Sequence, residues 1–359
     1  MTNSIVLSIV IATYNRSNFL QELLEKLLTS TATNDKRWNI VICDNCSTDD
    51  TIQMIEKLNS HLITVKRNDC TIPAFSNMIK AIFLSDGKYA LYCNDRDFIY
   101  PEHLTSLIDF LESNDYSFVT TSIKGRMSQK LKTYNTTEEK IHSAVFCHHP
   151  TGLIFNSEIA KQKLNMHDYF LQKDMLYTWD LLAWDLMNYG PCANSNLRIW
   201  SERTQDFLLE NKSGSVIKSN VYFLLETKYK VFCKVLEYIL SSDFYYTMNN
   251  NLQKETYERL LSFFANSTVE YKFSMGNKFI CGHYNISPRF ITTKEFCSLR
   301  KDFIKREIQF FKDNDIKVKE QSDLAIFLKS VQMSLFIDIK LLIHKIIPKE
   351  LKNLILKHK

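Results

Sequence analysis

The chain has 359 residues, enough for one large domain and a smaller one, and its 45% hydrophobic and 24% charged residues are typical of a globular protein. A formal net charge of +5 is too small to indicate a nucleic-acid-binding protein, and seven glycines with six prolines argue against a disordered one. No uncharged apolar run reaches the roughly 18 residues of a membrane-spanning helix, and no basic residue precedes the short run 5–12, so a cytoplasmic location without signal peptide is expected.

Strands and helices alternate over the first 110 residues. The apolar run 7–12 predicts a buried strand, and runs 38–43, 62–66 and 89–93 predict three more. A helix is predicted over 18–28 with Ser17 as its N-cap, and a second, capped by the run 47–50, extends to residue 58. Two more are predicted over 74–85 and from Pro101 to residue 111. This alternation predicts an α/β fold with a parallel sheet and right-handed crossovers, whose ligands bind at the carboxyl ends of the strands.

Polar segments follow three of these predicted strands. They are Thr13-Tyr14-Asn15-Arg16, Asp44-Asn45-Cys46-Ser47 and Asn94-Asp95-Arg96-Asp97. A single polar loop is ordinary, but each of these three carries an acid or an arginine at a position where this fold binds ligands. We therefore expect a binding site at this edge of the sheet.

The cysteines suit a reducing compartment. There are nine, an odd number that cannot pair completely within one chain. Cys43 and Cys46 form a Cys-x-x-Cys, but the second pair that a zinc site needs is missing. We interpret Cys43 as the end of a buried strand and Cys46 as a loop residue, with a redox pair as the alternative.

The rest of the chain changes character twice. Residues 117–201 are less regular and contain the run Cys147-His148-His149-Pro150-Thr151-Gly152 and a helical run, 177–186, that is interrupted by two acids. Beyond residue 214, long aromatic-rich helical segments are predicted over 216–240, 252–265, 294–312 and 323–347. We predict an α/β domain over 1–213, which holds the expected binding site, and a helical domain over 214–359.

The three polar segments carry a family resemblance. The run Leu7 to Arg16 resembles the first strand and loop of family 2 glycosyltransferases of the GT-A fold, and Asp44 to Thr51 resembles their D-N-x-S-x-D-x-T loop. Asp95-Arg96-Asp97 followed by Pro101 resembles their DXD region. The order and spacing agree over about the first 110 residues, fade over the middle and are absent from the C-terminal third.

The resemblance implies a nucleotide-sugar donor. Thr13, Tyr14 and Arg16 would line the nucleotide pocket, Ser47 would lie near the base or ribose, and Asn77 near the donor. Asp44 would accept a hydrogen bond from N3–H of uracil or thymine and would repel the bare N3 of cytosine. The donor is then a UDP-sugar or dTDP-sugar. The alternative for Asp44 is an acid at a helix start.

The resemblance also implies an inverting transfer, in which a carboxylate deprotonates the acceptor hydroxyl as the diphosphate leaves. Asp180 is the predicted base and Asp185 the second choice, with a helix cap as the alternative role for Asp180. Adjacent residues of a strand point to opposite sides, so His148 and His149 cannot both face one metal ion. One of them is predicted to face the acceptor sugar, or else to be structural.

The DXD region departs from the family pattern. Extended backbone would point Asp95 and Asp97 to one side, and such a pair suits Mn²⁺ or Mg²⁺ bound to the donor phosphates. The usual order, however, is D-x-D-D, three residues and proline. Counting back from Pro101 places Asn94 and Arg96 at the first two acids, and only Asp97 matches. We predict the Asp95/Asp97 metal pair, with an Arg96–diphosphate contact as the alternative.

The C-terminal segment is basic and amphipathic. From residue 329 onward there are seven lysines and two acids, a local excess as large as the charge of the whole chain. Apolar residues recur at helical spacing between Val331 and Ile347. This pattern predicts binding to a membrane surface, or packing on the catalytic domain or a second subunit.

We therefore predict a cytoplasmic or peripheral membrane hexosyl- or N-acetylhexosaminyltransferase of surface polysaccharide synthesis, acting on a saccharide or lipid-linked acceptor. One alternative is a nucleotide-sugar-binding protein that has lost catalysis, suggested by the altered DXD region. Another is a nucleotidyltransferase, but the glycine-rich and basic triphosphate loop of that class is missing after the first strand.

Overall fold

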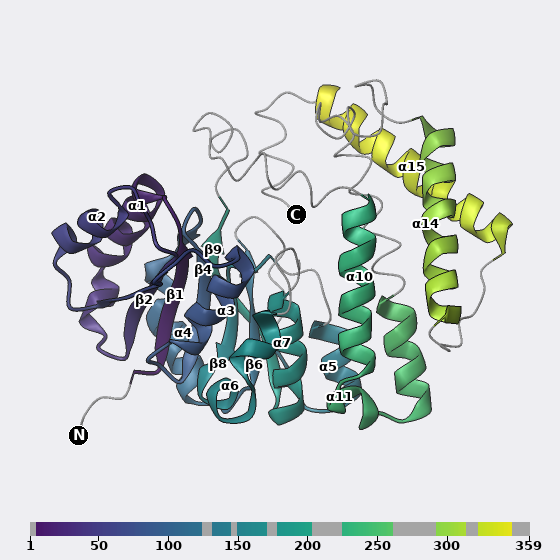
Figure 1. The fold of residues 1–359 in the computed structure, drawn as a ribbon. Helices are drawn as coiled ribbons and strands as arrows, with labels where there is room; N and C mark the ends of the chain where they lie inside the picture. The colour runs from purple at the N-terminus through teal and green to yellow at the C-terminus, as the bar shows by residue number, and fades with distance from the viewer. Residues whose placement is uncertain are drawn as a thin grey trace. The chain divides into compact units, whose positions relative to one another are not determined.

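The computed structural model describes residues 5–123, 131–144, 149–170, 178–202, 225–260, 292–313 and 322–346. It divides into two compact units, residues 1–207 with 241–249 and residues 208–240 with 250–359 (Figure 1). The predicted domain boundary at 213/214, the predicted acceptor residue His148 and the basic end 347–359 lie outside the described residues.

The first unit is built on one mixed sheet in the order β3-β2-β1-β4-β8-β6-β9-β5, with β7 beside β9. Strands β1 to β4 pair in parallel, as predicted, whereas β8 runs antiparallel to both β4 and β6. The predicted α/β class is confirmed. The strands are β1 Leu7–Thr13, β2 Trp38–Asp44, β3 Ile63–Arg67, β4 Tyr89–Asn94, β5 Phe98–Ile99, β6 Phe118–Ile123, β7 Lys132–Tyr134, β8 Leu153–Asn156 and β9 Cys192–Ser201.

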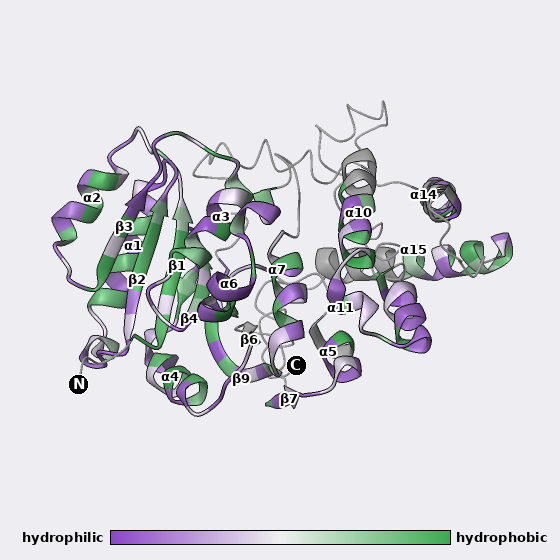
Figure 2. Cartoon of the chain, turned by 60° about the horizontal axis from the view of Figure 1, so that its bottom comes forward, coloured by the Kyte–Doolittle hydropathy of each residue, from purple (hydrophilic) through white to green (hydrophobic). Residues whose placement is uncertain are grey.

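Helices cover both faces of this sheet. Helices α1, α2 and α4 pack on one face, and α3, α6 and α7 contact strands from the other. Because β1 and β2 are buried on both faces, their sequences are continuous apolar runs rather than alternating ones (Figure 2). The helices are α1 Ser17–Leu28, α2 Thr51–Leu58, α3 Ala74–Phe83, α4 Leu104–Glu112, α5 Thr137–Ala144, α6 Ser157–Lys163, α7 Thr178–Leu186 and α11 Asp243–Tyr246.

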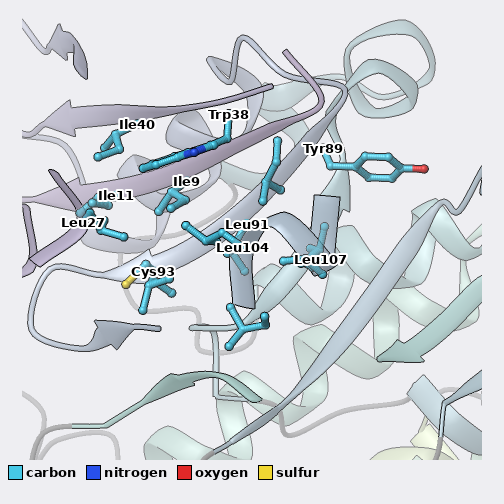
Figure 3. Packing of buried hydrophobic residues seen from close by; sticks show 14 of the residues in the cluster. Ile9, Ile11, Leu27, Trp38, Ile40, Tyr89, Leu91, Cys93, Leu104 and Leu107 are labelled. Carbon is cyan, nitrogen blue, oxygen red and sulfur yellow. The ribbon is translucent and has the colours of Figure 1, made fainter. Parts of the chain in front are cut away.

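The largest part of the core lies under α1 and α4. Ile9, Ile40 and Leu91 come from three neighbouring strands and are fully buried against Leu27 and Leu104 (Figure 3). Burying a side chain of this size contributes roughly 1.5–3 kcal/mol relative to leaving it exposed. This core holds β1, β2 and β4 in register and so aligns the loops that follow them.

Two predicted helix starts differ from the structure. Helix α1 begins at Ser17 itself, Arg16 occupies the N-cap position, and no side chain of the cap accepts a bond from the helix. The segment after Pro101 first forms a 3-10 turn, Pro101–His103, and α4 begins only at Leu104. The predicted cap at Ser17 is wrong because residues of the neighbouring loop bind the first N–H groups of α1, which the sequence alone does not reveal.

In the second unit, α10 (Leu225–Leu240) contacts α14 (Thr293–Asp313), and α14 packs along α15 (Asp323–Ile346). The buried Arg300 of α14 donates to the carbonyl of Ile326 and the hydroxyl of Ser330 on α15. The opposite side of α15 exposes apolar side chains, including Leu328 and Leu335. Among the described helices, none is long and apolar enough to cross a membrane.

Candidate functional site

The carboxyl ends of β1, β2 and β4 meet at one edge of the sheet. In the strand register, Thr13 pairs with Asp44, and Ala12 pairs with Asn94. The three polar segments predicted to converge, residues 13–16, 44–47 and 94–97, therefore lie side by side. We call this edge the donor edge, after the nucleotide-sugar donor that the family resemblance predicts there.

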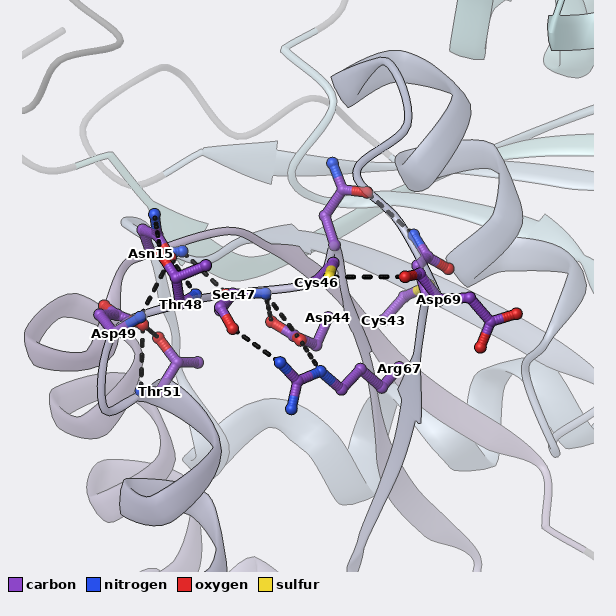
Figure 4. A network of polar contacts seen from close by, with 12 residues as sticks. Asn15, Cys43, Asp44, Cys46, Ser47, Thr48, Asp49, Thr51, Arg67 and Asp69 are labelled. Carbon is purple, nitrogen blue, oxygen red and sulfur yellow. Dashed lines mark hydrogen bonds and ion pairs between the residues drawn. The ribbon is translucent and has the colours of Figure 1, made fainter.

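The first two of these segments are joined by hydrogen bonds. Asn15 has a positive φ of 52°, a conformation that Asn tolerates better than most residues, and its backbone N–H donates to the Ser47 hydroxyl over 2.9 Å. The Asn15 side-chain oxygen accepts from the Thr48 N–H over 2.8 Å (Figure 4). The N–H groups of Arg16 and Ser17 donate to Thr51 Oγ1 and an Asp49 carboxylate oxygen. Ser47 thus orders the loop that carries Tyr14 and Arg16. The exposed ring of Tyr14 lies in that loop.

Asp44 lies at the centre of the donor edge and has no exposed surface. Its two oxygens accept from the Ser47 N–H over 3.1 and 3.3 Å, and Arg67 Nε lies 3.4 Å from the carboxylate. The acid at the start of α2 is instead Asp49, which accepts from both the N–H and the hydroxyl of Thr51. Asp49, and not Asp44, therefore has the role of the acid at the helix start.

Arg67 is a residue that the sequence analysis missed. It is the last residue of β3, pairs with Asp44 in the strand register, and donates to the Ser47 carbonyl over 2.8 Å (Figure 4). Its side chain is 50% exposed, so the guanidinium faces both the buried acid and solvent. One signal in the sequence could have predicted this pair. A basic residue follows one predicted strand, and an acid follows the predicted strand before it.

Asn77 is buried beneath the donor edge. Its amide donates to the Cys43 carbonyl over 2.9 Å and accepts from Asn68 over 2.8 Å and from the Cys43 thiol. These bonds tie α3 to β2 and to the loop after β3. The predicted contact of Asn77 with the donor stays a prediction, and the structure gives the side chain partners within the protein.

The same burial explains the Cys-x-x-Cys. Burial raises the pKa of the Cys43 thiol to about 11, so the thiol stays protonated near neutral pH. Cys46 has a positive φ of 63° and lies in the loop, and both thiols are free. This arrangement supports the structural interpretation of the pair over the redox alternative.

The segment after β4 is a turn. The Asp97 N–H donates to the Asn94 carbonyl over 3.0 Å, and the Asn94 amide donates to the Asp97 carboxylate over 2.9 Å. The prediction of extended backbone, with Asp95 and Asp97 pointing together, is therefore wrong. The closing bonds lie within residues 94–97, and the Thr151 hydroxyl braces the turn by accepting from the Asn94 N–H and donating to Asp97. The sequence does not reveal this contact with the segment that precedes β8.

The two carboxylates of this turn are held toward different neighbours of β4. Asp95 accepts from the Thr13 hydroxyl of β1 over 3.1 Å and lies 3.7 Å from Arg16 Nε. Asp97 accepts from the Thr151 hydroxyl, just before β8, over 2.5 Å. Strands β1 and β8 lie on opposite sides of β4, so the carboxylates diverge. Burial raises the pKa of Asp95 above its ordinary value, and Arg16 opposes that shift.

This donor set does not fit a shared divalent cation. In phosphate sites Mg²⁺ is usually held by one or two carboxylates together with substrate phosphates and water, but two carboxylates that share one cation must converge on it. Asp95 and Asp97 are instead held toward different strands by Thr13 and Thr151. Across the part of the chain that the structure describes, no group of three or more His, Cys, Asp or Glu side chains is placed to hold a metal ion. We therefore derive no catalytic step through a metal at Asp95 and Asp97.

His149 lies beside this turn. Its Nε2 is 3.8 Å from the Asp97 carboxylate and 3.9 Å from Glu202, and its ring stacks on Trp200 with 4.7 Å between the ring centroids. Trp200 in turn packs against Gly152, whose φ of +91° and close contact with the indole leave no room for a side chain. These neighbours support a structural role for His149 next to the donor edge, and its acceptor role stays a prediction.

Asp180 lies in the first turn of α7 and is buried. The neighbouring Trp179 packs on Phe75, in the first turn of α3, with the ring centroids 5.6 Å apart. Because α3 starts from the loop after β3, this contact brings the start of α7 to the same end of the sheet as the donor edge. Asp185, the second choice for the base, accepts a hydrogen bond from the Tyr169 hydroxyl instead.

Residues 8–175 match the sequence profile described as "Glycosyl transferase family 2". This segment is a family 2 glycosyltransferase domain. The family predicted from the first 110 residues is confirmed, and the matched segment contains all three polar segments of the donor edge and ends before α7.

Curated relatives of this domain are named glycosyltransferases. The chain is 31% identical over 114 residues to the UDP-Glc:α-D-GlcNAc-diphosphoundecaprenol β-1,3-glucosyltransferase WfaP of Escherichia coli, a match over 32% of this chain and 44% of WfaP. It is 30% identical over 115 residues to the abequosyltransferase RfbV of Salmonella typhimurium, over 30% of this chain and 33% of RfbV. The chain therefore spans less than half the length of these relatives.

Solved structures show the fold. The Staphylococcus aureus TarS fragment 1–349 in complex with UDP-GlcNAc matches with a TM-score of 0.53 at 16% identity, over 88% of this chain and 93% of that one. The mannosyltransferase PcManGT of Pyrobaculum calidifontis, solved with GDP-Man and Mn²⁺, matches with a TM-score of 0.52 at 11% identity, over 92% and 86%. The glycosyltransferase domain thus has the GT-A fold, in which divalent metals are common.

Proposed function

We propose that the chain transfers a hexose or N-acetylhexosamine from a UDP-sugar or dTDP-sugar to a saccharide or lipid-linked acceptor, with inversion at the anomeric carbon. The observation that carries the proposal is the donor edge, where the buried Asp44 lies beside Thr13 of β1 and the Arg16–Asp95 pair. A buried carboxylate at the ligand-binding edge of the sheet is suited to accept a hydrogen bond from a single N–H group of a ligand.

Asp44 would select the base. Its carboxylate accepts but cannot donate, so it favours the N3–H of uracil or thymine and disfavours the N3 acceptor of cytosine. The Asp44 side chain has no exposed surface and Arg67 Nε lies 3.4 Å from its carboxylate, so we propose that the half-exposed Arg67 moves aside when a base makes this contact. The displaced guanidinium can then donate to a carbonyl oxygen of the same base.

Asp180 would remove the proton from the attacking hydroxyl of the acceptor. The acceptor oxygen forms the new glycosidic bond as the bond between the anomeric carbon and the diphosphate breaks on the opposite face, so the configuration inverts. The surroundings of Asp180 support this role, because it is buried beside Trp179 at the donor-edge end of α7. The hydrogen bond from Tyr169 supports a structural role for Asp185.

The relatives support the substrate class. WfaP is named for transfer from UDP-Glc to a diphosphoundecaprenol-linked sugar, and TarS was solved with UDP-GlcNAc. A lipid-linked acceptor would also suit α15, whose exposed Leu328, Leu335 and Ile339 alternate with buried positions in a lysine-rich segment. We therefore propose a peripheral contact between α15 and an anionic membrane surface. The alternative is that the exposed face of α15 binds a second subunit.

A panel of ligands tests the proposal. The melting temperature of the full chain is measured with UDP, dTDP, CDP and GDP and with their sugar conjugates, and release of the nucleotide is then followed with acceptor added. We expect stabilisation by uridine or thymidine compounds and little by CDP or GDP. Stabilisation without transfer or donor hydrolysis would favour the alternative of a binding protein that has lost catalysis. The absence of stabilisation by any uridine or thymidine compound would refute the proposal.

A further inference from the structure

We propose that Arg96 and Arg16, rather than a divalent cation, offset the charge of the donor's diphosphate, so that the chain binds its donor without metal. This inference rests on the proposed function, because it concerns the diphosphate bound at the same donor edge. In this arrangement the positive charges that face the diphosphate come from arginine side chains of this chain.

The first support is the state of Arg96. It lies at the tip of the turn after β4, is half-buried, and makes no hydrogen bond or ion pair with any part of the chain that the structure describes. Arg67, by comparison, is paired with Asp44, and Arg16 lies 3.7 Å from Asp95. Arg96 therefore carries a guanidinium without a hydrogen-bonding partner among the described residues, in the turn that forms part of the donor edge and at a position where the family pattern has an acid. Its charge opposes the rise that burial causes in the pKa of Asp95.

The second support is the set of hydrogen bonds and ion pairs that Asp95 and Asp97 make within the protein. Asp97 is 2% exposed and accepts from the Asn94 amide and the Thr151 hydroxyl, so it closes the turn that displays Arg96. Asp95 accepts from Thr13 and pairs with Arg16, so it positions that second guanidinium next to β1. Both acids thus act as positioning residues for the loop and its arginines.

The chemistry of the ligand agrees with this assignment. A diphosphate presents several anionic oxygens, and a planar guanidinium can donate to two of them at once with a geometry that an ammonium group lacks. Two arginines from different strand ends can hold the leaving diphosphate from two directions. A metal ion shared by Asp95 and Asp97 would require both acids to turn away from Thr13 and Thr151, and it would be repelled by the charge of Arg96.

Binding measurements separate the two possibilities. The affinity of the full chain for UDP is measured by calorimetry in EDTA and again in Mn²⁺, with uridine as the ligand that lacks the diphosphate. We expect equal UDP affinity in both buffers. Arg96→Ala should weaken UDP binding by about tenfold to a hundredfold, the range for hydrogen bonds to charged groups, and leave uridine binding unchanged.

Two further variants sharpen the test. Lys36→Ala removes an exposed positive charge just before β2, at the opposite edge of the sheet, and should bind UDP like the unmodified chain. Arg96→Asp places an acid where the family pattern has one, and we expect UDP binding in EDTA to fall more than in Arg96→Ala. Because Arg96 makes no hydrogen bond or ion pair with the described residues, its variants should stay close to the melting temperature of the parent chain.

The outcomes distinguish this inference from the proposed function. UDP binding that needs Mn²⁺ in the unmodified chain would overturn the inference and leave the proposed function standing. Unchanged UDP affinity in Arg96→Ala would likewise overturn it. If neither UDP nor dTDP binds in either buffer, the proposed function fails, and the inference fails with it.

Discussion

Substituting Asp44 by Asn separates recognition of the base from stability of the fold. The side chain has no exposed surface, and its oxygens accept from the Ser47 N–H over 3.1 and 3.3 Å. Asparagine is nearly the same shape and keeps one oxygen for that bond. The exchange removes the charge and places an NH₂ group where the proposed N3–H of the base would donate.

The expected magnitudes differ for folding and binding. Folding loses the ion pair with Arg67, whose side chain is 50% exposed, so we expect a loss of less than about 1 kcal/mol. Binding loses a charge-assisted hydrogen bond in a buried position, which is about 1.5–3 kcal/mol, or roughly a 10- to 150-fold weaker affinity for UDP. The same NH₂ group can donate to N3 of cytosine, so the preference for UDP over CDP should shrink.

Calorimetry with UDP and CDP measures both effects, and thermal unfolding reports the stability. Asp69→Asn is the matched control, because it removes a carboxylate charge from an exposed residue of the neighbouring loop (Figure 4). We expect Asp69→Asn to bind UDP like the unmodified chain. An Asp44→Asn protein with unchanged melting temperature and a UDP affinity within about twofold of the parent would refute the proposed reading of the base.

Four further expectations concern other parts of the chain. Asp180→Asn should abolish sugar transfer and leave UDP affinity unchanged, and normal turnover would exclude Asp180 as the base. Iodoacetamide at pH 8 should label the exposed Cys70 and spare the buried Cys43, whose pKa is raised to about 11, as peptide mass spectrometry can show. Arg37→Ala breaks pairs with three acids at the amino end of β2 and should cost about 1–2 kcal/mol in unfolding measurements, since exposed pairs are weak individually. Leu335→Glu on α15 should weaken sedimentation with anionic vesicles, and no binding by the unmodified chain would refute the membrane proposal.

The strands and the donor edge were predictable because local patterns determine them. Continuous apolar runs at 7–12 and 38–43 require burial on both faces, and that requirement leads to a parallel sheet covered by helices. Parallel strands bring their carboxyl ends to one edge, so the nearness of Thr13 and Asp44 follows from the strand order. The later strands were not predicted, since their pairing joins segments as distant as β6 and β9.

The roles of single side chains depended on contacts between distant segments. Arg67 lies 23 residues from Asp44, and no local pattern links the two before β2 and β3 pair. The sequence predicts Ser17 as a helix cap, but Asp49 and Thr51 supply the acceptors at the start of α1. A hydrogen bond between residues so far apart in sequence exists only once the sheet is assembled.

The sequence by itself determined the fold class and the family of residues 8–175, and it predicted the edge at which a donor would bind. It did so because apolar periodicity and the spacing of the polar loops are properties of short segments. Only the tertiary structure decided how the acids of the turn after β4 are used. The Thr13 hydroxyl binds Asp95 beside β1, and the Thr151 hydroxyl binds Asp97 just before β8, so the two carboxylates on either side of Arg96 are held toward different strands.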